Sequence, residues 1–314
     1  MCKMQIEFIR VASDYFEVIT ITDNIKGHTT KRRFMRPRTV TSLIHEFGAE
    51  FWYKTIDKAT KKYDTFINVP DNTKTYKQVF GSCYNIYHPM AHKASLDATN
   101  CPETLNFLKH IFGEQLETGI DYIKLLYEKP KQRLPILCLV SEENGTGKST
   151  FTKFLKDIFT HSMAIVSGDD IENNYTSCFA DKLIVACEES FFNTSKNSSL
   201  IKTINSSDKI KFNAKGLSRM ELDCFIKFVL TSCNEDNFLI AKKEDKNIWV
   251  RKLTTPTNPK ENLINLLAEE IPNFLNYLNK RTLVNTNESM FYFSPEVIHT
   301  SALTKLIKGN KTKL

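Results

Sequence analysis

The sequence predicts an α/β fold built on a parallel sheet, and three features predict it. Residues 134–140 form a near-continuous apolar run, which is typical of a buried parallel strand. Residues 151–159 follow with apolar side chains at i, i+3, i+4, i+7 and i+8, the spacing of one helical face. Two further apolar runs, 182–187 and 225–230, predict two more buried strands.

A glycine-bearing loop, residues 141–150, joins the first strand to the helix, and we interpret it as a phosphate-binding loop (P-loop). A triphosphate needs backbone N–H groups and the positive end of a helix around it. Lys148 would reach the outer phosphates, and Ser149 would place its hydroxyl on a Mg²⁺ ion. Glu142 stands where the full pattern has a glycine, so we expect a differently shaped first half. The predicted ATP-binding residues are Asn144, Gly145, Thr146, Gly147, Lys148, Ser149 and Thr150.

Polar residues end the two later strands. The run 182–187 is followed by Glu188 and Glu189, and the run 225–230 leads to Asn234. Beside a phosphate loop, one carboxylate can coordinate the bound Mg²⁺ or one of its waters, while the next takes a proton from the attacking water. We predict Glu188 as the acid on the Mg²⁺ side and Glu189 as the general base. Asn234 would sense the γ-phosphate or the attacking water.

A basic segment, residues 209–219, lies between these strands, and its turn residues and alternating pattern predict a β-hairpin. Such a hairpin could follow a nucleic-acid backbone, with Phe212 as a stacking neighbour; a solvated surface hairpin is the alternative. The predicted nucleic-acid contacts are Lys209, Lys211, Lys215 and Arg219.

Arg251 is the only arginine between Asn234 and the last amphipathic region, residues 262–278. In ring-forming ATPases a neighbouring subunit supplies positive charge to the transferring phosphoryl group, and arginine suits this task. Arg251 is therefore the candidate arginine finger, and a surface arginine at a strand end is the alternative.

Outside the loop region the sequence predicts a less defined organisation. We expect a strand near 16–21, helices near 40–52, 102–112, 120–127 and 262–278 with an interruption at Pro272, and a turn at 168–170. The basic segment 31–38 is either a surface loop or a binding region. The predicted domains are an N-terminal accessory region of unknown role (1–95), a helical collar (96–133), a P-loop ATPase core (134–258) and a C-terminal helical segment with a basic tail (259–314).

Composition points to a soluble globular protein. The chain has 314 residues, 41% of them hydrophobic, and a net charge of +7 that permits a polyanionic partner. It contains no run of 18 apolar residues and no signal-peptide pattern, so we expect a cytoplasmic protein without a membrane partner. The eight cysteines form no CxxC pair and are expected to be reduced. Pro89 between His88 and His92 argues against a metal-binding helix there.

The loop, the two acids and the strand-end asparagine follow one another between residues 145 and 234, with the basic hairpin before the last. This order resembles superfamily 3 helicases. More narrowly, residues 140–152, 211–216 and 232–238 look like the helicase part of phage and mobile-element primase-helicase proteins. The resemblance implies an AAA+-type P-loop core, a hexameric ring with ATP at subunit junctions, and movement on single-stranded DNA. It would make Glu188 and Glu189 the Walker B pair, Asn234 the sensor 1 residue and Lys215 the DNA-hairpin residue.

The sequence therefore leads us to expect an ATP- and Mg²⁺-dependent replicative DNA helicase of a phage, virus or plasmid. Its expected partners are single-stranded DNA, further copies of the chain in a ring, and a separate primase or polymerase. An ATP-switched initiator or loader that binds DNA without unwinding it is the first alternative. A P-loop small-molecule kinase is the second, although the segment after Glu189 has no arginine before Arg219.

Overall fold

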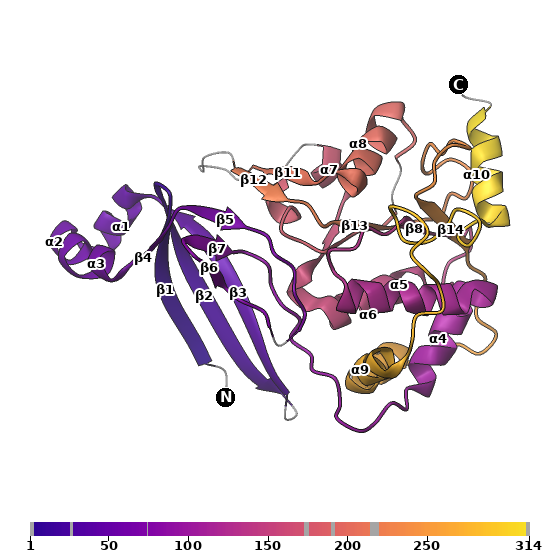
Figure 1. The fold of residues 1–314 in the computed structure, drawn as a ribbon, viewed down its shortest axis with the longest axis horizontal. Coiled ribbons are helices and arrows are strands. Elements are labelled where there is room, and N and C mark those ends of the chain that lie inside the picture. Colours follow the sequence, from indigo (N-terminus) through magenta and orange to yellow (C-terminus); the bar gives the residue numbers. More distant parts are fainter. Residues whose placement is uncertain are drawn as a thin grey trace.

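The computed structural model describes residues 3–25, 28–73, 75–172, 176–189, 192–213 and 220–311. A strongly twisted N-terminal sheet lies beside a larger core in which helices cover both faces of a second sheet (Figure 1). Nowhere in these ranges is a helix both long and apolar enough to span a membrane.

The sheet of the core has five strands, and every pair in it is parallel. Its strands are β8 (Ile136–Val140), β9 (Met163–Val166), β10 (Ile184–Cys187), β13 (Lys227–Ser232) and β14 (Ile248–Lys252), in the order β14-β8-β13-β10-β9. The α/β fold class predicted from the sequence is confirmed. Because β13 lies between β8 and β10, the segments that follow these three strands meet at one edge of the sheet.

Alternate residues of β8 point to opposite faces of the sheet, and both faces are buried. Leu137 and Leu139 belong to a core that includes α4 (Pro102–Phe112), α5 (Leu116–Glu128), α6 (Lys148–Phe159) and α9 (Leu263–Lys280). Ile136, Cys138 and Val140 belong to a second core with α8 (Ser195–Ser206) and α10 (Ser301–Lys311). Each fully buried leucine contributes about 2 kcal/mol, so the strand that carries the phosphate loop is firmly anchored.

Three helices differ from the prediction. α9 runs through Pro272, where we predicted an interruption, because a buried face that includes Ile271, Phe274 and Leu275 packs along its length. Gly168–Glu172 is a short helix, α7, and not only a turn. Part of the predicted basic tail forms α10, whose Leu306 is fully buried. In both terminal helices tertiary packing outweighs local preference.

The N-terminal sheet has the order β3-β2-β1-β4 and consists of β1 (Lys3–Val11), β2 (Asp14–Ile25), β3 (His28–Arg38) and β4 (Lys61–Tyr63). The strand predicted near residues 16–21 lies within β2. The basic segment 31–38 is part of β3, which is an edge strand and therefore tolerates Pro37.

Smaller elements complete this region. The chain continues with α1 (Val40–Phe47), α2 (Ala49–Phe51), a π-helical turn (Trp52–Ile56) and α3 (Asp57–Ala59). Residues of α1, β1 and β2 pack around the buried Trp52 of the turn. A second small sheet contains β5 (Thr65–Ile67), β6 (Val79–Phe80) and β7 (Cys83–Asn85). The predicted hairpin is present: β11 (Lys209–Phe212) pairs antiparallel with β12 (Met220–Asp223).

Candidate nucleotide-binding site

The loop after β8 has the backbone that phosphate binding requires. Gly145 and Gly147 adopt φ angles of +70° and +96°, which side chains with a Cβ rarely adopt. Gly147 is the N-cap of α6 and provides no side-chain cap, so the N–H groups of the first turn are available to an anion. Lys148 begins the helix, and its Nζ donates to the carbonyl oxygens of Ser141 at 2.7 Å and Glu143 at 3.3 Å. A bound phosphate could replace these two acceptors.

The predicted general base lies opposite this loop. A cavity of about 160 Å³ is lined by the loop residues and Glu189. The loop residues that line it are Asn144, Gly145, Thr146, Gly147, Lys148, Ser149 and Thr150. The fold therefore brings Glu189 to the same small space as the predicted ATP-binding residues.

Two groups from the end of β13 fix Glu189. Its φ angle is +49°, a strained conformation for a residue other than glycine, and such strain often marks functional sites. The backbone N–H donates to Oγ1 of Thr231 at 3.4 Å, and Oε1 accepts from the thiol of Cys233 at 3.5 Å. The neighbouring strand thus holds both the backbone and the carboxylate of Glu189.

Of the two residues predicted to hold magnesium, Ser149 lines the loop cavity and Glu188 does not. Oε1 of Glu188 is buried and accepts no hydrogen bond from the residues that the structure describes. Ser149 is exposed in the first turn of α6. Mg²⁺ in such sites takes one or two protein oxygens, with phosphate oxygens and waters completing the shell. Both side chains offer oxygen atoms of the kind that Mg²⁺ binds, and the assignment of Glu188 as a ligand stays a prediction.

The first half of the loop is held by Glu235 and needs no glycine at position 142. Glu142 is absent from the residues with positive φ, and its side chain is exposed. Its N–H donates to Oε1 of the buried Glu235 at 3.4 Å. Burial raises the pKa of Glu235, but hydrogen bonds from Lys252 and Lys305 outweigh this and leave the pKa below its ordinary value. Glu235 thus stays ionised as a fixed acceptor.

Asn234 is not directed at the loop in this structure. Its Oδ1 accepts the backbone N–H groups of Asp236 at 3.0 Å and Asn237 at 2.7 Å, so the side chain stabilises its own turn. The residue before it, Cys233, places its sulfur 3.6 Å from Nζ of Lys148 and close to Glu189. Sequence reasoning missed Cys233. The run Asn234-Glu-Asp-Asn predicts a turn that uses the Asn234 side chain, and this could have indicated that the preceding residue faces the loop.

Arg251 lies on β14, away from the loop cavity. It is only 7% exposed, and its NH1 contacts Oε1 of Glu114 at 2.7 Å and Oε1 of Gln115 at 2.9 Å. An arginine finger must reach a neighbouring subunit, so Arg251 would have to break both contacts to serve as one.

The described part of the hairpin has balanced charge. Lys209 forms an ion pair with Asp223 at 2.7 Å, and Lys211 faces Glu221 across the two strands. Two of the predicted nucleic-acid contacts, Lys215 and Arg219, lie outside the described residues. The case for the hairpin as a nucleic-acid contact therefore depends on its tip.

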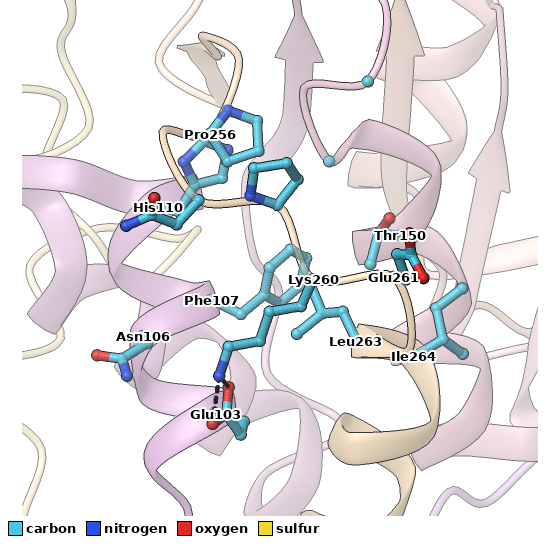
Figure 2. A pocket seen from close by; sticks show the side chains of 14 residues that line it. Glu103, Asn106, Phe107, His110, Thr150, Pro256, Lys260, Glu261, Leu263 and Ile264 are labelled. Atoms are coloured by element: carbon cyan, nitrogen blue, oxygen red, sulfur yellow. Dashed lines mark hydrogen bonds and ion pairs between the residues drawn. The ribbon is translucent and has the colours of Figure 1, made fainter.

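A second cavity of about 280 Å³ adjoins the phosphate loop (Figure 2). It shares Gly145, Gly147 and Thr150 with the loop, and its other walls come from α4, the segment before α9, and α9 itself. His110 of α4 contacts the carbonyl oxygen of Thr146 through Nε2 at 3.0 Å. Apolar side chains in the lining are Phe107, Pro256, Pro259, Leu263 and Ile264. Sequence reasoning missed this cavity, because its walls come from segments about 150 residues apart that no local pattern connects.

The strand order, the glycine loop and the position of Glu189 opposite the loop together define an α/β P-loop fold. Two solved structures of the NrS-1 C-terminal region in apo form are similar to the chain, with TM-scores of 0.70 and 0.71. Each covers 98% of this chain and 72% of the other, at 16% and 17% identity. The model of a family of unknown function, DUF5906, matches residues 139–252. No curated protein sequence matches the chain. The chain thus shares the fold of the NrS-1 region along nearly its whole length.

Proposed function

We propose that the chain hydrolyses ATP in this site and uses the energy to move on single-stranded DNA as a replicative helicase of a phage, virus or plasmid. The observation that carries the proposal is the position of Glu189 in one cavity with the phosphate loop. A protein that hydrolyses ATP needs a base near the bound γ-phosphate, whereas a protein that only binds the nucleotide does not.

The two cavities suit the two parts of ATP. The triphosphate would occupy the loop cavity, where Lys148 exchanges the carbonyl of Ser141 for a phosphate oxygen. The nucleoside would enter the adjoining cavity beside Phe107, which offers an apolar wall. Ser149 and Glu188 would hold Mg²⁺, which neutralises phosphate charge when bound. Water would attack the γ-phosphorus, the bond to the bridging oxygen would break, and Glu189 would take the proton, leaving ADP and phosphate.

The motor function is supported by the order of the loop, acids and third strand, which resembles superfamily 3 helicases. Such motors act as rings with ATP at subunit junctions, so we propose a homo-oligomer, with six copies as the expected number. A separate primase or polymerase would complete the replication machinery.

A second candidate is an ATP-switched DNA loader that does not unwind DNA. The observation in its favour is Arg251, which is buried and held by Glu114 in its own chain. Without an available finger, turnover depends on another cation. Exposed lysines at positions 242, 243 and 246 are the nearest such groups in the sequence after Asn234.

The test measures ATP turnover with and without single-stranded DNA, together with displacement of a labelled strand from a forked duplex. For the helicase we expect turnover that DNA stimulates, strand displacement, and loss of both in Glu189→Gln. Binding of DNA and ATP with neither turnover nor displacement would favour the loader. Turnover that requires a small-molecule acceptor would instead favour a kinase.

A further inference from the structure

A groove of about 850 Å³ lies between the N-terminal sheet and the edge of the core that carries β9 and β10. β3 forms one wall with Arg33, Phe34 and Arg36. The other wall includes His161 and Lys182 of the core. The lining also includes Phe212, the last residue of β11. The groove is separate from the phosphate loop and from the adjoining cavity.

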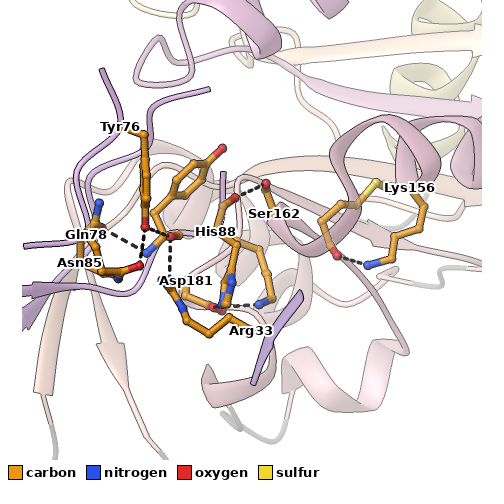
Figure 3. A network of polar contacts seen from close by, with 11 residues as sticks. Arg33, Tyr76, Gln78, Asn85, His88, Lys156, Ser162 and Asp181 are labelled. Carbon is orange, nitrogen blue, oxygen red and sulfur yellow. Dashed lines mark hydrogen bonds and ion pairs between the residues drawn. The ribbon is translucent and has the colours of Figure 1, made fainter. Parts of the chain in front are cut away.

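The segment Tyr87-His88 joins the two walls through polar contacts, so the groove is preformed. NH2 of Arg33 donates to the carbonyl of Tyr87 at 3.1 Å, and Oγ of Ser162 donates to the carbonyl of His88 at 2.7 Å. Nε2 of His88 lies 3.8 Å from Oδ2 of Asp181 (Figure 3). Burial and the charges of Arg33 and Lys182 lower the pKa of His88 well below its ordinary value. His88 is thus a neutral part of this junction at pH 7.

The groove attracts anions. Its lining contains three cationic side chains, Arg33, Arg36 and Lys182, and one carboxylate, Asp181, which pairs with Lys182 at 2.7 Å. On β3, Arg38 pairs with Glu17 and Glu46, whereas Arg33 and Arg36 line the groove. Arg36 is exposed, and none of the described residues forms an ion pair with it. Its guanidinium is therefore available to a phosphate.

The groove also presents aromatic rings. Phe34 is 41% exposed and meets the ring of His161 edge to face, with ring centroids 5.7 Å apart. Phe212, which also lines the groove, is half-buried. Cations beside exposed aromatic rings are the combination that binds a single nucleic-acid strand, since phosphates meet the cations while bases stack on the rings. A purely electrostatic partner, such as an acidic peptide, would have no use for the rings.

We propose that this groove binds single-stranded nucleic acid and guides it toward the hairpin, with Arg36 contacting a phosphate and Phe34 stacking on a base. The inference rests on the nucleic-acid partner proposed above, and it places that partner on the N-terminal region as well as on the hairpin.

The test is fluorescence anisotropy of a dye-labelled oligodeoxythymidylate with the full chain, without nucleotide, across a series of salt concentrations. Arg36→Glu should weaken binding about tenfold. It should also reduce the slope of log affinity against log salt concentration by about one, the value for one released counterion. Phe34→Ala should weaken it about five- to a hundredfold, the range for one stacked base. Both residues are exposed, so neither change should impair folding.

Matched controls lie on the same region outside the groove. Lys62→Glu on β4 reverses an exposed charge, and Phe51→Ala removes a ring that is 54% exposed. Both controls should bind within twofold of the wild type. Wild-type affinity in Arg36→Glu and Phe34→Ala would overturn the proposal. ATP turnover without DNA should be unchanged in all four variants. This measurement tests the proposed hydrolysis independently of nucleic-acid binding in the groove.

Discussion

The thiol of Cys233 donates to Oε1 of Glu189 across 3.5 Å, and its sulfur lies 3.6 Å from Nζ of Lys148. One side chain from the end of β13 therefore touches both the candidate base and the loop lysine. β13 can occupy this position because it runs between β8 and β10 in the sheet.

Alkylation of Cys233 is predicted to abolish ATP turnover, because the adduct would fill the space between Lys148 and Glu189. N-ethylmaleimide should inactivate the wild type, and Mg·ATP should protect it. Cys233→Ser should be active and resistant to the reagent. The control is Cys178→Ser, which removes an exposed cysteine elsewhere and should remain sensitive. Equal inactivation of Cys233→Ser would show that the reagent acts at another site.

Glu142→Gly is predicted to leave ATP affinity within about twofold of the wild type, because Glu142 has negative φ and an exposed side chain. Glu235→Gln should weaken ATP binding and lower the free energy of unfolding by about 1–3 kcal/mol, since it disturbs a buried acceptor. Titration with a fluorescent ATP analogue and urea denaturation measure the two effects. A large gain in affinity for Glu142→Gly would mean that the carboxylate faces the phosphates.

Arg251→Ala is predicted to lower the free energy of unfolding by about 1–3 kcal/mol, because it removes a buried guanidinium and its contacts with Glu114 and Gln115. Glu114→Gln should cost less, since the Glu114 side chain is 77% exposed. Urea denaturation measures both. Unchanged stability of Arg251→Ala combined with lost turnover would instead identify Arg251 as the finger.

Lys227 is predicted to make stability depend on pH. Burial lowers the pKa of Lys227 to about 7, and its Nζ donates to the carbonyls of Pro130 and Phe225. The unfolded chain keeps this proton up to a pKa of about 10.4, so the unfolded state binds more protons above pH 7 and stability rises with pH.

Comparison with Lys227→Met isolates this effect. Between pH 7 and 8.5 the wild type should gain about 1.5 kcal/mol relative to the variant, and titration of the thiols cancels because both proteins have the same cysteines. Urea denaturation of both proteins at the two pH values measures the change. A constant difference between them would mean that Lys227 remains charged in the folded protein.

The central sheet and the phosphate loop could be predicted because their signals are local. Residues 134–140 are apolar without interruption, and the glycine loop is followed at once by a helical face. β3 could not be predicted, since its run of basic residues is typical of a surface segment and Pro37 opposes a strand. β1 does carry a strand signal that we missed, because apolar residues alternate with polar ones from Met4 to Phe8.

The roles of individual site residues were harder to predict, because they depend on the direction in which each side chain points. Asn234 and Cys233 are adjacent, and only the turn that follows β13 determines which of them faces Lys148. Arg251 meets Glu114, which is 137 positions away, and no sequence pattern indicates that pair.

The most direct test of the account separates ATP binding from ATP hydrolysis in Glu189→Gln, with Glu142→Gln as the control that removes a nearby exposed carboxylate. We predict that Glu189→Gln binds a fluorescent ATP analogue within about threefold of the wild type while its turnover falls about a hundredfold or more. Glu142→Gln should match the wild type in both measurements. Wild-type turnover in Glu189→Gln would contradict the assignment of Glu189 as the base that faces the phosphate loop.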